Sequence, residues 1–138
     1  VARRPYPWGD MPGGGVLDST QACWRGAGLP LNSTCPVGLL PAGATPSGIY
    51  DLAGNVEEWN ADWLVTYRDS PPGCWANTPV TDPICLDRAM APAPGNRVVR
   101  GGAWIDASAV RLHSASRFEG NAISRKYYVG FRCARDTH

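Results

Sequence analysis

The acidic residues of the segment 51–58 have the types and the spacing to bind a metal ion. Asp51 and Glu58 supply two carboxylates, and Gly54 permits a tight turn that can aim main-chain carbonyl oxygens inward. Calcium prefers such an all-oxygen shell. The spacing is not that of an EF-hand, so the residues alone leave two interpretations open, a calcium site or a glycine turn flanked by solvated acids.

The five cysteines are spaced for disulfides rather than for metal binding. Neither Cys23 and Cys35 nor Cys74 and Cys85 form a C-x-x-C motif, and each pair brackets a segment rich in Pro, Gly or Asn. We predict that each pair closes a surface loop in an oxidising compartment, the alternative being five reduced thiols in a cytosolic protein. Cys133 is left over, either as a buried thiol or bonded to something outside the chain.

No nucleophile in the sequence has an identifiable catalytic partner. The chain contains no G-x-S-x-G, P-loop or G-x-G-x-x-G motif. His113 lies in a predicted strand, where a lone histidine forms hydrogen bonds more often than it ligates a metal. Glu57 and Glu58 are adjacent in an extended segment and face opposite ways, so they cannot converge on one substrate atom. We therefore expect no catalytic residue in this chain.

The composition restricts the partners. The chain has 138 residues, enough for one domain, and its net charge of +1 gives no pull toward nucleic acid or an anionic membrane. No apolar stretch is long enough to span a membrane, and the start of the chain lacks the apolar segment of a signal peptide.

The abundance of turn-forming residues predicts a loop-rich α+β fold. Sixteen Gly and thirteen Pro argue against long helices, and six Trp must supply core area that regular elements do not. Residues 68–95 are expected to form a long surface excursion closed by a disulfide. Strand patterns at 97–104, 110–117 and 127–134 predict a small twisted antiparallel sheet.

Five segments occur in an order that one protein family shares. They are Tyr6-Pro7-Trp8-Gly9, Pro36-Val37-Gly38, residues 48–56 with Glu58-Trp59, residues 97–104, and residues 130–135. Together they resemble the formylglycine-generating-enzyme (sulfatase-modifying factor) domain. The resemblance spans nearly the whole chain but only the C-terminal half of that domain. It implies a variant of the C-type lectin fold and a single domain, residues 1–138, without the N-terminal half.

The resemblance implies a structural calcium ion at the segment 51–58. In the family this segment binds calcium through two side chains and two main-chain carbonyls, here those of Asp51, Gly54, Val56 and Glu58. The ion would organise the loop and hold Trp59 and Trp63 in the core.

The family's activity oxidises a sulfatase cysteine to formylglycine, with copper held by two cysteines soon after a Gly-Gly-aromatic turn. Here the corresponding stretch, residues 103–113, has no cysteine, so copper–thiolate catalysis is excluded on ligand grounds. The alternative is the C-terminal part of a metal-dependent oxidoreductase of the formylglycine-generating or sulfoxide-synthase type, with its ligands on an upstream half. Where the family commonly has Trp this chain has Glu57, which predicts an exposed position.

A binding surface is the remaining interpretation. Loops 105–109 and 118–128 are expected at the open end of the sheet, where lectin-like folds bind ligands and some phage and bacterial display proteins are hypervariable. Their aromatic and polar side chains suit a glycan or protein ligand, and the candidates are Asp106, Phe118, Asn121, Arg125, Tyr127 and Tyr128. We predict a non-catalytic, calcium-stabilised binding or structural domain, secreted or in the periplasm or cell envelope. Cys133 would join it to the upstream half of the domain or to another chain.

Overall fold

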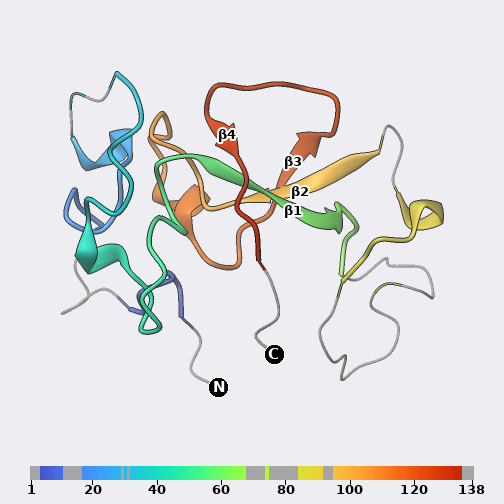
Figure 1. The fold of residues 1–138 in the computed structure, drawn as a ribbon, viewed down its shortest axis with the longest axis horizontal. Helices are drawn as coiled ribbons and strands as arrows, with labels where there is room; N and C mark the ends of the chain where they lie inside the picture. The colour runs from blue at the N-terminus through green and yellow to red at the C-terminus, as the bar shows by residue number, and fades with distance from the viewer. Residues whose placement is uncertain are drawn as a thin grey trace.

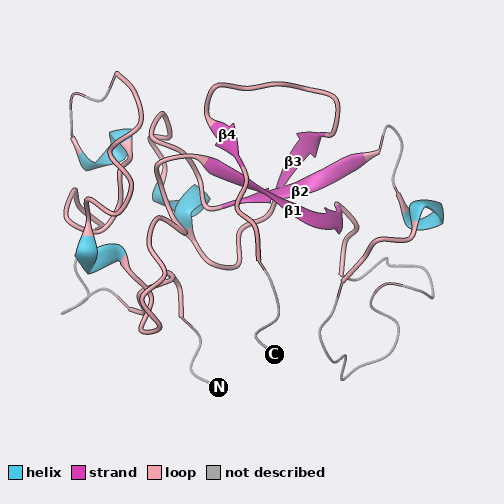
Figure 2. Ribbon diagram, viewed as in Figure 1, coloured by secondary structure: helices cyan, strands magenta, loops and turns pink. Residues whose placement is uncertain are grey.

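The computed structural model describes residues 4–10, 17–28, 30, 32–67, 74, 84–91 and 95–134. Loops surround one small sheet (Figure 1) whose strands are β1 (Glu57–Trp63), β2 (Asn96–Arg100), β3 (Phe118–Asn121) and β4 (Val129–Gly130). The helical elements of this described part are short 3₁₀ turns (Figure 2), namely η2 (Arg25–Ala27), η3 (Pro41–Gly43), η4 (Arg88–Met90) and η5 (Ala109–Leu112). No helix within these ranges is long and apolar enough to cross a membrane. The loop-rich expectation is confirmed, although the described residues contain no α-helix.

The sheet is mixed rather than antiparallel. Its strands lie in the order β3-β2-β1-β4, and β2 runs antiparallel to both β1 and β3. However, β4 pairs parallel to β1, with Glu57 opposite Val129. The chain arches over the sheet between β3 and β4 (Figure 1) and so enters β4 in the direction of β1. The prediction of a purely antiparallel sheet is therefore wrong for this pair.

Two of the predicted strands differ from the elements observed. Residues 110–117 begin in the 3₁₀ turn η5, because that turn places Leu112 in the core with 0% exposure and leaves Val110 outside. Only Val129–Gly130 of the predicted strand 127–134 pairs as a strand. The predicted strand 97–104 is confirmed as β2, which stops at Arg100 because Gly101 and Gly102 take positive φ angles of 91° and 68°.

The hydrophobic core has two parts, and the smaller one includes the last residue of β1. The larger contains Tyr6, Leu17, Ala22, Trp24, Ala53 and Leu112, and burial raises the pKa of the Tyr6 hydroxyl. The smaller contains Trp63, Cys74 and Cys85. Trp63 is buried as expected, whereas Trp59 is only half-buried.

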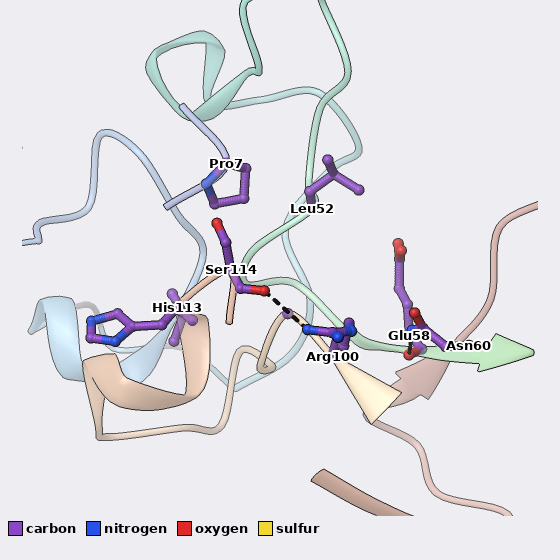
Figure 3. A pocket seen from close by; sticks show the side chains of 9 residues that line it. Pro7, Leu52, Glu58, Asn60, Arg100, His113 and Ser114 are labelled. Atoms are coloured by element: carbon purple, nitrogen blue, oxygen red, sulfur yellow. Dashed lines mark hydrogen bonds between the residues drawn. The ribbon is translucent and has the colours of Figure 1, made fainter. Parts of the chain in front are cut away.

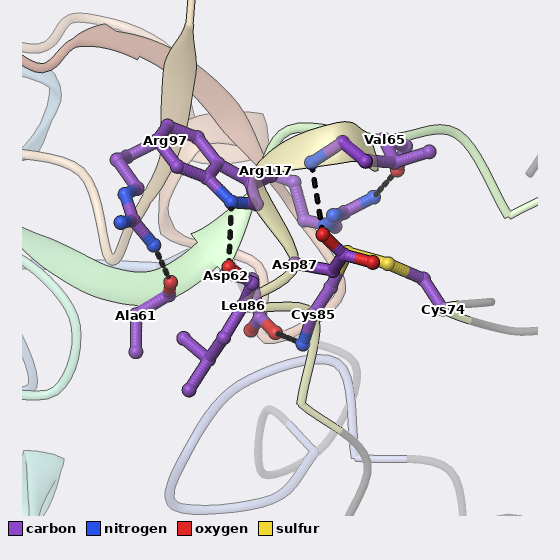
Figure 4. Close-up of a disulfide and its surroundings, with 11 residues drawn as sticks. Ala61, Asp62, Val65, Cys74, Cys85, Leu86, Asp87, Arg97 and Arg117 are labelled. Atoms are coloured by element: carbon purple, nitrogen blue, oxygen red, sulfur yellow. Dashed lines mark hydrogen bonds between the residues drawn. A yellow bond between two sulfur atoms is a disulfide. The ribbon is translucent and has the colours of Figure 1, made fainter. Parts of the chain in front are cut away.

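Both predicted disulfides are present, with Cα–Cα distances of 6.1 Å for Cys23–Cys35 and 5.1 Å for Cys74–Cys85. The segment after Cys85 is fastened to β1 (Figure 4), since the Trp63 indole donates to the Leu86 carbonyl at 3.0 Å. Most of the predicted excursion 68–95 lies outside the described residues. Cys133 is exposed, so the buried-thiol interpretation is wrong; a bond to a partner stays a prediction.

Candidate functional site

The main chain of the segment 51–58 is held in an unusual shape by the core beneath it. Asp51, Gly54 and Asn55 all have positive φ angles, of 56°, 80° and 63°. The Gly54 N–H donates to Gly101 and the Asn55 N–H to Cys23, each at 2.9 Å. A Cβ at Gly54 would lie 2.8 Å from the Cys23 carbonyl oxygen, so only glycine fits there.

The predicted calcium ligands Asp51, Val56 and Glu58 line one hollow of about 320 Å³. One carboxylate oxygen of Asp51 accepts a 2.7 Å hydrogen bond from the Gly38 N–H, which fixes its orientation. Within the described structure, the carbonyl oxygens of Gly54 and Val56 accept no hydrogen bond. This segment therefore offers two carboxylates and two open carbonyls, the donor types that a hard cation takes.

An arginine from the C-terminal segment already supplies a positive charge to this hollow. The Arg132 Nε lies 2.8 Å and 2.7 Å from the two carboxylate oxygens of Glu58. Its terminal nitrogens donate at 2.9 Å to the carbonyls of Tyr50 and Asp51. The hydrogen bond to Glu58 raises the pKa of the guanidinium against the opposing effect of burial. Arg132 thus binds a carboxylate and two carbonyls, as a metal cation would.

The described residues contain no group of three or more His, Cys, Asp or Glu side chains that could hold a metal ion. A calcium ion at the segment 51–58 would therefore depend on the main-chain carbonyls as well as on Asp51 and Glu58. The donor set fits the ion, but Glu58 would have to be shared with Arg132.

A second polar cluster lies in the stretch 103–113, where the family's cysteine pair is expected. Arg111 forms an ion pair with Glu57 and places its Nε 2.8 Å from a carboxylate oxygen of Asp106. Asp106 also accepts a 2.7 Å hydrogen bond from the Ala103 N–H. Burial lowers the pKa of the Arg111 guanidinium, but the hydrogen bond to Glu57 and the charge of Asp106 outweigh it, so the pKa lies above its usual value. An ion network thus occupies this stretch.

The exposed position predicted for Glu57 is wrong. Only 3% of its side chain is exposed, because Arg111 covers it and neutralises its charge. Neither Glu57 nor Arg111 was among the candidate residues. An unpaired carboxylate is costly to bury, so a Glu at a position where the family resemblance implies Trp could have signalled a buried cationic partner.

Of the six residues predicted to bind a glycan or protein ligand, four lie in two contacting groups and the other two lie apart from them. Arg111 joins Asp106 to Phe118, since its guanidinium lies 3.9 Å from the Phe118 ring centroid. Tyr127 lies 5.2 Å from Tyr128 and 6.1 Å from the largely buried Trp104, centroid to centroid. Asn121 instead shapes its own turn, where its side chain accepts from the Ile123 N–H. Arg125 is exposed and contacts no other described side chain through a hydrogen bond or an ion pair.

A hollow of about 250 Å³ lies beside the start of β1 (Figure 3), and the charged side chains that line it are paired. Arg100 donates at 3.0 Å to the carbonyls of Ser114 and Ser116, and Glu58 is paired with Arg132. His113 is directed to the Tyr6 hydroxyl at 3.2 Å, in the hydrogen-bonding role expected for it.

The chain belongs to the family of sulfatase-modifying factor enzyme 1-like domains, whose model matches residues 2–137. It is 33% identical to the formylglycine-generating enzyme of Streptomyces coelicolor over 99% of this chain and 42% of that protein. It is 31% identical to the hercynine oxygenase of Mycolicibacterium thermoresistibile over 97% of this chain and 27% of that protein. The fold is similar to that of Treponema denticola variable protein 1, with a TM-score of 0.61 and 25% identity over 91% of this chain and 39% of that one.

These coverages show that the chain spans less than half the length of each of these proteins. The family resemblance read from the five sequence segments is confirmed.

Proposed function

We propose that this chain is a non-catalytic, extracytoplasmic binding domain whose ligand face is formed by the loops 105–109 and 118–128. The observation that carries the proposal is the ion network of Glu57, Arg111 and Asp106, which fills the stretch where formylglycine-generating enzymes hold copper. These three side chains neutralise one another and leave no thiol or unpaired base there. The two disulfides support an oxidising compartment.

The ligand face we propose centres on the exposed Tyr127 and the half-buried Tyr128 beside it. Tyr127 is 77% exposed while its ring packs at an angle against Trp104, so the ring is both accessible and held in place. Such aromatic side chains bind glycans and proteins at a small entropic cost. Similarity to a protein named a variable protein agrees with this role and with the C-type-lectin-like architecture that we propose for the whole domain.

A glycan array tests this face. We expect the purified chain to bind a subset of printed glycans and Tyr127→Ser to lose that binding by about tenfold without a change in stability, because the side chain is a surface anchor. Tyr67→Ser, a change at another exposed tyrosine, is the matched control. Binding that is equal in the variant and the wild type would remove Tyr127 from the site.

The alternative is that the chain is the C-terminal part of a metal-dependent oxidoreductase with its metal ligands elsewhere. The similarity to a formylglycine-generating enzyme and a hercynine oxygenase favours it. The two proposals differ over the part of the polypeptide upstream of this chain, because the alternative requires a cluster of histidine or cysteine metal ligands there. Sequencing that upstream part and finding no such cluster would leave only the binding role.

We also propose that the segment 51–58 binds a structural calcium ion through Asp51, the carbonyls of Gly54 and Val56, and Glu58. The ion would supply the positive charge that holds the two carboxylates and the turn between them together. The open carbonyls at Gly54 and Val56 support the proposal.

Calcium is expected to raise the melting temperature of the wild type and to have little effect on Asp51→Asn. Asparagine tolerates the positive φ angle of Asp51 and can still accept from Gly38, so this variant removes only the charge. Asp87→Asn, outside the segment, should respond to calcium as the wild type does. A ligand at a hundredfold excess over its Kd stabilises by about 2.7 kcal/mol, which scanning calorimetry resolves readily.

Glu58→Ala is a less specific test. Because Glu58 also pairs with Arg132, the Glu58→Ala variant should be less stable than the wild type even in chelator. In calcium the difference in stability between variant and wild type should be larger, because the variant also loses a calcium ligand. Equal losses in the two media would contradict calcium binding.

A further inference from the structure

We propose that a hollow between β1, β2 and the segment after Cys85 binds a carboxylated sugar, the hexuronate unit of an acidic saccharide. This inference rests on the proposed binding function and names its ligand class. The hollow has a volume of about 470 Å³, within the range of small-molecule sites. None of the ligand residues expected from the sequence lines it; its lining is Trp59, Asn60, Ala61, Leu86, Arg97 and Ala122.

Trp59 provides a fixed aromatic surface in this hollow. A Cβ at Gly120 of β3 would lie 2.3 Å from Cζ3 of the Trp59 ring and 2.8 Å from Cγ1 of Val99. Only glycine at position 120 therefore lets the indole lie against the β2–β3 pair. Trp59 remains half-buried rather than covered, so part of the ring is open to a ligand. The C–H face of a pyranose packs on such a ring through apolar contact.

Arg97 provides a preorganised binding group for a carboxylate. Its guanidinium lies 3.6 Å from the Trp63 ring centroid and donates one hydrogen bond to the Ala61 carbonyl (Figure 4). Among the described residues this is its only hydrogen bond, which leaves most of its five N–H donors for a ligand. A planar guanidinium that is already held in place binds a carboxylate through paired hydrogen bonds.

The charge and the remaining polar groups of the hollow select the ligand further. Arg97 is the only charged side chain among the described residues of the lining, and the nearby Asp62 accepts a 2.7 Å hydrogen bond from the Cys85 N–H. The Asn60 side chain donates to the Glu58 carbonyl at 3.2 Å and lies beside Glu58 in the hollow of Figure 3, so it is not counted as a ligand group. An aromatic surface beside a guanidinium matches a sugar that carries one carboxylate.

Titration calorimetry with trigalacturonic acid and with its methyl ester, both in chelator, tests the proposal. The ester keeps the sugar rings and hydroxyls but replaces each carboxylate with an uncharged methyl ester, and we expect the acid to bind about tenfold more tightly because the ester cannot form the ion pair with Arg97. Equal affinities for acid and ester would overturn the proposal, as would no binding of the acid.

Substitution at Leu86 locates the site without disturbing the fold. Its side chain is 52% exposed, and its attachment to β1 is made by its carbonyl oxygen. We expect Leu86→Glu to weaken binding of the acid about tenfold through like-charge repulsion, and Leu86→Gln to bind nearly as well as the wild type. Unchanged affinity in Leu86→Glu would overturn the proposal.

Tyr127→Ser separates this proposal from the proposed ligand face, and we expect it to bind the acid normally. If Tyr127→Ser loses the acid while Leu86→Glu retains it, the loops 118–128 bind the sugar: the inference is then wrong and the proposed function stands. If the chain binds glycans on the array but not the acid, the same conclusion holds.

Discussion

Replacing Glu57 by alanine is expected to lower the free energy of unfolding by about 3 kcal/mol, because Arg111 then loses its most buried partner. Only 3% of the Glu57 side chain is exposed, and Arg111 is two-thirds covered by Glu57, Asp106 and Phe118. For a domain of this size the melting temperature should fall by about 10 °C. Urea denaturation followed by tryptophan fluorescence measures the loss.

The control for this prediction replaces the whole ion pair. Glu57→Leu combined with Arg111→Met and Asp106→Asn should recover most of the stability, because apolar side chains of similar size often match or exceed a buried ion pair and the amide leaves no unpaired carboxylate at position 106. Asp106→Asn keeps the acceptor for the Ala103 N–H and should cost less than Glu57→Ala. A loss below about 1 kcal/mol in Glu57→Ala would show that the pair contributes little to the fold.

The sequence sufficed for features that depend on local spacing. Both disulfides join cysteines that flank short turn-rich segments, so the pairing followed from the sequence alone. The turn at residues 51–58 was likewise recognisable from Gly54 between two acids, and the structure confirms a positive φ angle at Gly54, whereas those at Asp51 and Asn55 were not expected.

Features that depend on distant residues could not be predicted in this way. The parallel pairing of β4 with β1 joins residues more than seventy positions apart, and the arch after β3 decides its direction. Arg132 is 74 residues away from Glu58 in the sequence. The residue pattern of the segment 51–58 therefore does not reveal that an arginine forms an ion pair with the Glu58 carboxylate. The burial of Glu57 depends in the same way on Arg111, 54 residues further along the chain.

The strand predicted over residues 110–117 was wrong for a different reason. Residues 110–117 alternate apolar and polar types as a strand does, yet Leu112 is the residue that the core requires. A 3₁₀ turn delivers that one side chain to the core and leaves Val110 exposed. Packing of a single residue thus overrides the alternating pattern.

Removing the Cys23–Cys35 disulfide is expected to cost about 3 kcal/mol, since closing a loop of this length restricts the unfolded chain by that amount. The double variant Cys23→Ala/Cys35→Ser avoids a new free thiol, and urea denaturation measures its stability. Cys133→Ser, which removes an exposed thiol, should leave stability unchanged. A double variant as stable as Cys133→Ser would contradict the prediction.

This disulfide is also expected to affect calcium binding, which a disulfide that only restricted the unfolded chain would not do. Cys23 accepts from the Asn55 N–H through its carbonyl, while the Cys35 N–H donates at 3.2 Å to the Asn55 side chain. The two cysteines therefore hold Asn55 from both sides, between the proposed carbonyl ligands of Gly54 and Val56. Without the disulfide the segment around Cys35 is free to leave Asn55, so calcium should stabilise the double variant less than the wild type. An equal calcium response in both proteins would show that the core beneath Gly54 is enough to shape the site.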